Sequence, residues 1–340
     1  MCAKRVVHLG PIGSQGGMSS VIEILLKNSP DGWESDVICT FSNKSLFGKI
    51  FAWRNAQYKL NYLIKNKKID IAHIHVTHSI SWFRKVSFMK NCRKNNIPII
   101  VHIHSGRFDD FCNRYFGFLG AYVKRCLNHK NTKVILLEHR WKKILKKWVP
   151  PNSEVINNSA DVEIKKKDYD ENDCLNILML ARGDKIKGHL FAIEILEYLI
   201  AKGNNVKMDM TGMKKPKKYL NKSINFNEWI SDENRNKLIS NSDFLILPSE
   251  FEGSSMSVIE SIVNELPCLA SNSSSETIGI DELILPLNSP KEWGDKIISL
   301  MDKNEYKRIH MKIKEQAVRF DPTVNKKIWG DTYKNLIKND

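Results

Sequence analysis

The sequence predicts an α/β protein made of two Rossmann-like domains that face each other across a cleft. The chain has 340 residues, which is enough for two domains that each bury a core of their own. In both halves, short runs of β-branched and apolar residues alternate with longer helical stretches, as in parallel sheets covered by helices. Residues 149–173, with Pro150-Pro151 and a charged patch, separate the two series and have the composition of a linker.

The first half is expected to contain four strands and four helical stretches. The expected strands are Lys4–Gly10, Asp70–Val76, Ile97–His104 and Lys133–Glu138. The expected helices cover residues 18–28, 46–66, 82–95 and 108–129.

The second half repeats this pattern. The expected strands are Leu175–Ala181, Val206–Thr211, Phe244–Leu247 and Cys268–Ala270, with helices near 188–202, 232–240 and 257–264. We therefore place an N-terminal domain at residues 1–160, a C-terminal domain at 161–322, and a final helix at 323–340 that returns to the N-terminal domain. Open parallel sheets bind ligands beyond the carboxyl ends of their strands, so the loops after the strands carry the functional candidates.

The positive charge of the chain is concentrated in its first half. Residues 1–150 hold 26 Lys and Arg against 8 Asp and Glu, whereas the remaining residues hold 27 against 30. A basic domain beside a near-neutral one indicates an anionic partner of the first half, which could be a membrane, a nucleic acid or a phosphorylated substrate.

Cysteine spacing and hydropathy indicate the cellular compartment in which the protein is expected. The seven cysteines are scattered without a C-x-x-C pair, which is typical of buried thiols in a reducing environment. The N-terminus lacks the pattern of a signal peptide, and no apolar run approaches the roughly 18 residues that span a bilayer. We expect a cytoplasmic protein that is soluble or peripheral to a membrane.

Three loops after strands contain residues suited to a phosphorylated ligand. The segment Gly10–Gly17 ends in Gly16-Gly17 at a helix start, where small residues and free N–H groups can approach a phosphate. Arg182 and Lys187 follow the strand that ends near Leu180, and they suit a diphosphate. Taken alone, however, the first segment could be a plain strand-to-helix turn, and the two basic residues could be solvated.

The third loop holds two carboxylates eight residues apart, Glu252 and Glu260. Glu252 lies in a Gly/Ser loop and Glu260 about two turns into the following helix, so the pair could grip two points of an extended ligand. The amides of Ser254–Ser257 at the helix start would face an anionic group. The structural alternative is a capped helix that carries a surface glutamate.

These elements together resemble the family 4 retaining glycosyltransferases, which have the GT-B fold of two Rossmann-like domains. The resemblance covers most of the chain, and it is strongest over residues 243–271. The matching elements are Gly16-Gly17, Asn158-Ser159-Ala160-Asp161, Arg182 with Lys187-Gly188, the E-x7-E pair Glu252 and Glu260, and, in capsule and exopolysaccharide members, Leu287–Trp293.

The resemblance implies a role for each matching residue. Arg182 and Lys187 would hold the donor diphosphate, Glu260 the ribose hydroxyls and Glu252 the donor sugar. The remaining implied donor-site and reaction-site residues are Gly16, Gly17, His104, Ser254, Ser255 and Met256.

The chain departs from the family pattern at three places. Ala181 and Glu265 stand where the family usually has Gly, and both changes look structural. Ser254-Ser255 replaces the usual Phe-Gly and touches the expected donor-sugar pocket. The identity of the transferred sugar is therefore left open.

Metal binding is not expected. The histidines of the first half (His73, His75, His78, His102 and His104) have no carboxylate or cysteine at ligand spacing, and His104 is singled out as a hydrogen-bonding group. Asp168-Tyr169-Asp170 has the form of a D-x-D metal motif, but it lies in the charged linker. We expect no metal and no cofactor besides the nucleotide sugar substrate.

The segment Leu46–Lys68 mixes aromatic and basic residues, and it could lie against an anionic membrane or simply pack on the sheet. The resulting hypothesis is retaining transfer from a nucleotide diphosphate sugar, a UDP-sugar, to a lipid-linked or cell-surface glycan, as in capsule, exopolysaccharide and lipopolysaccharide synthesis. The alternatives are a nucleotide-sugar epimerase of the same fold and a non-enzymatic binder of nucleic acid or sugar. No recognisable nucleic-acid motif occurs, so we expect no nucleic-acid partner.

Overall fold

The computed structural model divides the chain into two compact units. Unit 1 comprises Met1–Ser159 with Pro322–Asp340, and unit 2 comprises Ala160–Asp321. The structure describes residues 3–14, 16–42, 46–160, 169, 174–216, 222–228 and 230–338.

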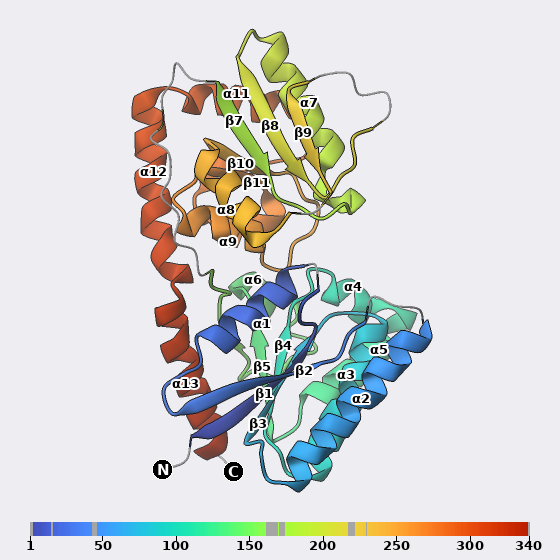
Figure 1. Cartoon of the computed structure of the whole chain (residues 1–340). Coiled ribbons are helices and arrows are strands. Elements are labelled where there is room, and N and C mark those ends of the chain that lie inside the picture. Colours follow the sequence, from blue (N-terminus) through green and yellow to red (C-terminus); the bar gives the residue numbers. More distant parts are fainter. Residues whose placement is uncertain are drawn as a thin grey trace. The chain divides into compact units, whose positions relative to one another are not determined.

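Unit 1 is built on a parallel sheet whose described strands follow the order β2-β1-β3-β4-β5-β6 (Figure 1). The strands are β1 (Lys4–Gly10), β2 (Trp33–Cys39), β3 (Ile71–Val76), β4 (Ile99–Ile103), β5 (Thr132–Leu136) and β6 (Glu154–Val155). β3 and β4 are buried along their whole length, because helices cover both faces of the sheet. The chain changes direction between β1 and β3, so the loops after these two strands lie at a switch point.

The helices of unit 1 form two layers. Figure 1 shows α2, α3 and α5 on one side of the sheet, with α1 and α13 on the other. Their bounds are α1 (Gly17–Lys27), α2 (Leu46–Lys65), α3 (Ile80–Lys94), α4 (Phe108–Asn113), α5 (Phe118–Leu127), α6 (His139–Ile144) and α13 (Pro322–Lys338). The C-terminal helix α13 belongs to unit 1, where the Tyr333 hydroxyl lies 3.2 Å from His73 Nδ1 and Lys326 pairs with Asp31.

Unit 2 has a second parallel sheet, with the described strands in the order β12-β11-β10-β7-β8-β9. The strands are β7 (Leu175–Met179), β8 (Val206–Thr211), β9 (Ile224–Asn227), β10 (Phe244–Leu247), β11 (Cys268–Ser271) and β12 (Ile284–Leu285). The helices are α7 (His189–Ala201), α8 (Asp232–Asn241), α9 (Met256–Val263), α10 (Ser275–Ile278), α11 (Pro290–Leu300) and α12 (Lys303–Ala317). The switch point lies between β7 and β10, whose loops hold Arg182, Lys187 and Glu252.

The predicted strands are confirmed, but four further strands were missed. β2 alternates exposed residues with buried or partly buried ones and includes Glu34 and Asp36, so it lacks a continuous apolar pattern. β6 lies inside the segment predicted as a linker, and β9 and β12 are short edge strands. Asp161 and the D-x-D residues Asp168 and Asp170 lie outside the described residues.

The prediction of one helix over residues 108–129 was wrong. The structure has α4 and α5 separated by a short 3-10 turn, Tyr115–Gly117. Tyr115 and Phe116 both have φ of 55° and Gly117 has φ of 83°, so three consecutive residues are left-handed. The apolar periodicity of this segment continues through the break, so it gave no signal of this turn.

Candidate functional site

At the switch point of unit 2, an ion pair joins the loops that follow β7 and β10. Lys187 Nζ lies 2.6 Å from Glu252 Oε1, and both side chains are largely buried. A buried ammonium and carboxylate stabilise each other, and removing one partner would remove this compensation of the other buried charge. The structure thus places two of the sequence-predicted site residues in direct contact.

A glycine and backbone contacts explain why these loops meet. Gly188 has φ of 77°, and a Cβ at this position would lie 2.0 Å from the Pro248 carbonyl oxygen. The Glu250 N–H donates to the Ile186 carbonyl oxygen at 2.8 Å, which fixes the two loops side by side. A residue with a side chain at Gly188 would force them apart, so the Lys-Gly step serves the geometry of Lys187.

Glu260 lies in α9, buried, with its Oε2 3.5 Å from Arg235 Nε of α8. Burial raises the pKa of Glu260 to about 7, while the nearby charge of Arg235 opposes that rise. The Glu260 carboxyl therefore titrates near neutral pH. Once ionised, it can accept hydrogen bonds from the hydroxyl groups of a ligand.

The start of α9 offers polar groups beside this pair of carboxylates. Ser255 is the N-cap residue, and its hydroxyl lies 3.0 Å from that of Ser257. Met256 opens the helix, whose first N–H groups have no acceptor within the helix. The Ser254 hydroxyl oxygen is buried and has no hydrogen-bond partner among the described residues, which is unusual for a buried polar atom.

Arg182 differs from these residues because it is open to solvent. Its side chain is 56% exposed, and its Nη2 lies 3.1 Å from Asp184 Oδ2 in the same loop. Exposed ion pairs of this kind contribute little free energy. The guanidinium can therefore leave Asp184 for an anionic ligand at small cost.

In unit 1, the glycine loop after β1 leads into α1. Gly16 is the N-cap residue with φ of 137°, and Gly17 begins the helix. Below the loop, the buried Lys85 of α3 donates to the Leu9 carbonyl oxygen at 2.5 Å and to the Thr40 hydroxyl at 2.6 Å. Lys85 thereby ties the carboxyl end of β1 to the end of β2.

Five histidines line one face of β1, β3 and β4 and the end of β4. His8 Nδ1 lies 3.1 Å from His75 Nε2, and His75 Nδ1 lies 2.9 Å from His104 Nε2. His73 Nε2 likewise lies 3.2 Å from His102 Nδ1. Burial, and to a lesser degree the charge of Lys85, lowers the pKa of His104 to about 3. His104 is therefore neutral at physiological pH and suited to hydrogen bonding.

Two overlapping groups within this cluster have nitrogen atoms close enough to surround a metal ion. They are His8, His73 and His75, and His75, His102 and His104, with ligand atoms within 4.8 Å of one another. Neither group includes a carboxylate or thiolate, and the hydrogen bonds between the rings already use most of these nitrogen atoms.

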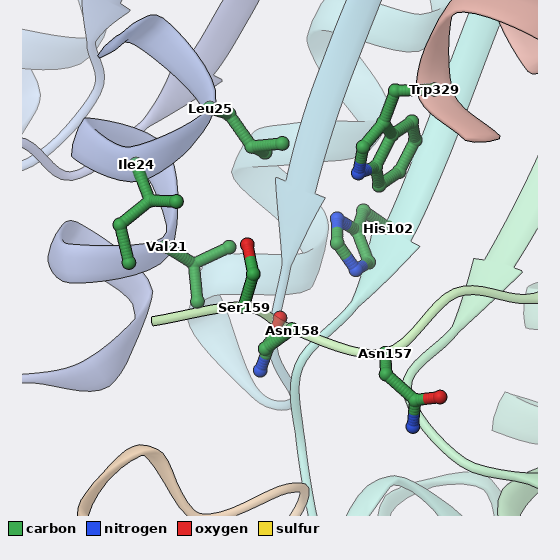
Figure 2. A pocket seen from close by; sticks show the side chains of 8 residues that line it. All are labelled: Val21, Ile24, Leu25, His102, Asn157, Asn158, Ser159 and Trp329. Carbon is green, nitrogen blue, oxygen red and sulfur yellow. The ribbon is translucent and has the colours of Figure 1, made fainter. Parts of the chain in front are cut away.

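A small cavity lies next to this cluster in unit 1. Figure 2 shows Val21 and Leu25 of α1, His102, Ser159 and Trp329 of α13 around it. The His102 and Trp329 ring centroids are 5.4 Å apart. Asn158 of the predicted domain-junction element also lines the cavity, and within the described part of the chain its buried side-chain oxygen has no hydrogen-bond partner.

Two charged residues, Arg235 and Lys85, were not predicted from the sequence. Both lie in helices where neither spacing nor a motif distinguishes them from other basic residues. The departure at Glu265 has a clear geometric setting: its φ is 57°, a conformation that favours glycine, and its carboxylate pairs with His310 and Lys314.

Comparison with known proteins adds an independent line of evidence. Residues 174–303 match the family model described as glycosyl transferases group 1. An uncharacterised 41.2 kDa protein in the cps region of Klebsiella pneumoniae is 20% identical over 327 residues, covering 88% of this chain and 90% of that protein.

Two further similarities concern proteins whose names state an activity. The Escherichia coli UDP-Gal:alpha-D-GlcNAc-diphosphoundecaprenol alpha-1,3-galactosyltransferase is 24% identical over 290 residues, covering 71% of each chain. The structure of a sucrose-phosphate synthase from Thermosynechococcus elongatus superposes with a TM-score of 0.75 at 16% identity, covering 99% of this chain and 100% of that one. This likeness shows the GT-B fold, and the family match supports a glycosyltransferase.

Proposed function

We propose that this protein is a retaining glycosyltransferase that transfers a sugar from a UDP-sugar to a lipid-linked or cell-surface glycan in bacterial polysaccharide synthesis. The observation that carries the proposal is the arrangement at the switch point of unit 2. The loops after β7 and β10, where such sheets bind ligands, hold the buried pair Lys187 and Glu252. The second loop leads into the start of α9, which carries the buried Glu260.

The donor would be held by complementary charges and hydrogen bonds. Arg182 and Lys187 would bind the diphosphate, and the free N–H groups at Ser255 and Met256 would add positive potential there. Glu260 would accept hydrogen bonds from the ribose, and Glu252 from the donor sugar, with the Ser254 hydroxyl available to the same ligand.

The chemical demand of the transfer is to stabilise negative charge on the departing diphosphate while the sugar gains oxocarbenium character. Fixed cationic and N–H groups aimed at the diphosphate do this without reorganisation. We therefore propose a metal-independent reaction in which Arg182, Lys187 and the start of α9 supply the positive potential. In unit 1, Gly16 and Gly17 would approach the phosphate, and the neutral His104 would hydrogen-bond the reacting sugar.

The acceptor is proposed to be lipid-linked, with the protein attached peripherally to the cytoplasmic face of the membrane. The Escherichia coli relative is named for a diphosphoundecaprenol acceptor, and the first half of this chain is strongly basic. In the described part of the chain, no helix is both long and apolar enough to cross a bilayer.

The test is calorimetric titration of the purified protein with a panel of nucleotides and nucleotide sugars in the presence of EDTA. We expect UDP to bind with EDTA present and its affinity to fall at least tenfold in Glu260→Ala. Glu228→Ala, an exposed carboxylate of the same unit, is the matched control and should bind as the unchanged protein does. Absence of binding to every nucleotide would overturn the proposal.

A further inference from the structure

We propose that the helical layer formed by α2, α3 and α5 of unit 1 docks on an anionic lipid bilayer, and that the turn Tyr115–Phe118 inserts aromatic side chains into it. This inference deepens the peripheral membrane association proposed above, because it names the surface and the inserting element. It rests on that part of the proposed function and not on the donor site.

The turn between α4 and α5 displays aromatic side chains to solvent. Tyr115 is 76% exposed, Phe118 is 77% exposed and Phe116 is fully exposed. Tyr115 and Phe116 also occupy the left-handed region, which costs on the order of 1 kcal/mol for each non-glycine residue. A strained turn that holds three large aromatic side chains away from the core contributes nothing evident to folding, so a partner outside the unit would explain it.

The turn belongs to a wider aromatic surface. Among the residues that the structure describes, eight of the nine exposed large aromatic side chains lie between residues 46 and 127. The Phe83 ring of α3 stacks on Tyr122 of α5, with ring centroids 6.2 Å apart, and Trp53 of α2 donates to the Ser87 hydroxyl of α3. These contacts join the three helices into one layer, as Figure 1 shows.

The same layer is exclusively basic. The sequences of α2, α3 and α5 contain no Asp or Glu and eleven Lys and Arg, of which Lys85 is buried in the unit. On the opposite face of the sheet, α1 carries Glu23 and α13 carries Asp331. Each Lys or Arg near an anionic membrane surface favours binding, and aromatic rings favour the boundary between head groups and acyl chains.

This combination selects a bilayer over other partners. Two copies of the layer facing each other would bring like charges together, which disfavours a symmetric dimer. The segment Arg114–Leu119 partly matches the RNP1 pattern of RNA-binding sheets, but here it forms a turn and a helix start, whereas that pattern acts from a β-strand. A bilayer, by contrast, offers acyl chains to Phe116 and anionic head groups to the lysines and arginines around it.

The experiment is flotation of the full chain with vesicles of phosphatidylcholine alone or mixed with phosphatidylglycerol. We expect binding to the anionic vesicles that weakens with added NaCl. The triple variant Tyr115→Ser, Phe116→Ser and Phe118→Ser should reduce the partition coefficient at least tenfold, and Lys124→Glu with Arg125→Glu should reduce it at low salt. The matched control is Met311→Ser on α12, since Met311 is an exposed apolar residue of unit 2 that is distant in sequence from the donor loops, and it should leave partitioning unchanged.

The outcomes separate this inference from the donor-site proposal. Circular dichroism and UDP titration of each variant should match the unchanged protein, because all substituted side chains are exposed and belong to other parts of the chain than the proposed donor site. Vesicle binding that is equal in the triple variant and the unchanged protein would overturn the insertion. Self-association or nucleic-acid binding that the triple variant loses, with lipid binding unaffected, would assign the surface to that partner instead.

Discussion

The two units have parallel sheets of similar build but differ in where their charged side chains lie and in how these are paired. Unit 2 carries opposite charges in buried or partly buried pairs, Lys187 with Glu252 and Arg235 with Glu260. Unit 1 lines its central strands with neutral imidazoles, and its buried Lys85 contacts backbone and hydroxyl oxygens. Its excess positive charge lies on the outer helices instead.

Under the proposed function, this difference would correspond to two kinds of ligand contact. In a site with a preformed ion pair, the cation can exchange its carboxylate partner for a diphosphate, since the cation is already positioned and partly desolvated. A site lined by neutral groups, such as the histidines of unit 1, can orient sugar hydroxyls. It would not compete with the charged site of unit 2 for the phosphate. The contrast can be tested by perturbing each unit separately.

The largest effect is expected from the cations of unit 2. Arg182→Ala and Lys187→Ala should each reduce sugar transfer by a factor of about 100 to 1,000, as removal of one donor to a developing anion does. The measurement is kcat/KM with the donor identified by the binding panel. Lys185→Ala in the same loop is the matched control, because its exposed side chain forms no part of the buried pair.

Near-normal turnover in both Arg182→Ala and Lys187→Ala would contradict the assignment of unit 2 as the diphosphate site. Since Lys187 is paired inside the fold, its variant also needs a stability check. Lys187→Met, which keeps the bulk of the side chain, should lose transfer equally if the charge is what matters.

The second effect concerns acid stability of unit 1. The pKa values of His8 and His104 are lowered to about 3, chiefly by burial, so the folded unit resists protonation that the unfolded chain accepts. The contribution of these histidines to the free energy of unfolding is therefore fully present above the unfolded pKa near 6.5, and it is lost as pH falls toward 3. At pH 5 the loss is about 2 kcal/mol for each of these histidines.

Hydrogen exchange resolved by peptide would locate this loss. Between pH 7.5 and 5, and after correction for the intrinsic exchange rate, peptides from β1, β3 and β4 should lose protection before those from β7 and β10. Earlier loss in unit 2 would show that the buried histidines do not govern acid unfolding.

The third effect is the pH dependence of donor binding in unit 2. Because the pKa of Glu260 is raised to about 7, its ionised form, which accepts ribose hydrogen bonds, becomes dominant only above that pH. UDP affinity should rise about tenfold from pH 6 to pH 8. Arg235→Met removes the charge that favours ionisation, so it should move the midpoint to higher pH.

Isothermal titration at several pH values tests this, with Glu260→Gln as the variant that should lose the pH dependence. Arg235→Lys should restore part of the original profile, because it keeps a cation near the carboxylate. A midpoint that is the same in Arg235→Met as in the unchanged protein would contradict the coupling.

The smallest effect concerns the backbone at Glu265. Its φ of 57° favours glycine, so Glu265→Gly should be more stable than Glu265→Ala by about 1 kcal/mol, although both lose the contacts with His310 and Lys314. Urea denaturation of the two variants measures the difference. Equal stability would mean that the left-handed conformation carries no cost at this position.

Much of the architecture followed from local pattern. The buried strands, such as β3 and β10, are continuous apolar runs that alternate with helices, so their order was predictable. The strands with charged or short sequences, β2 and β12, were missed because an edge position tolerates such sequences. The break at Tyr115–Gly117 was missed because nothing in the spacing of apolar residues interrupts the helical period.

For the candidate site, the sequence alone determined which residue types follow which strands, because a glycine after a strand and charges beyond it are local features. It also determined the uneven charge of the two halves. Only the tertiary structure decided that Lys187 contacts Glu252 and that Arg235 approaches Glu260. It also decided that exposed aromatic residues share a helical layer without Asp or Glu. These contacts join segments far apart in the chain, and strand order and helix packing, rather than local propensity, bring them together.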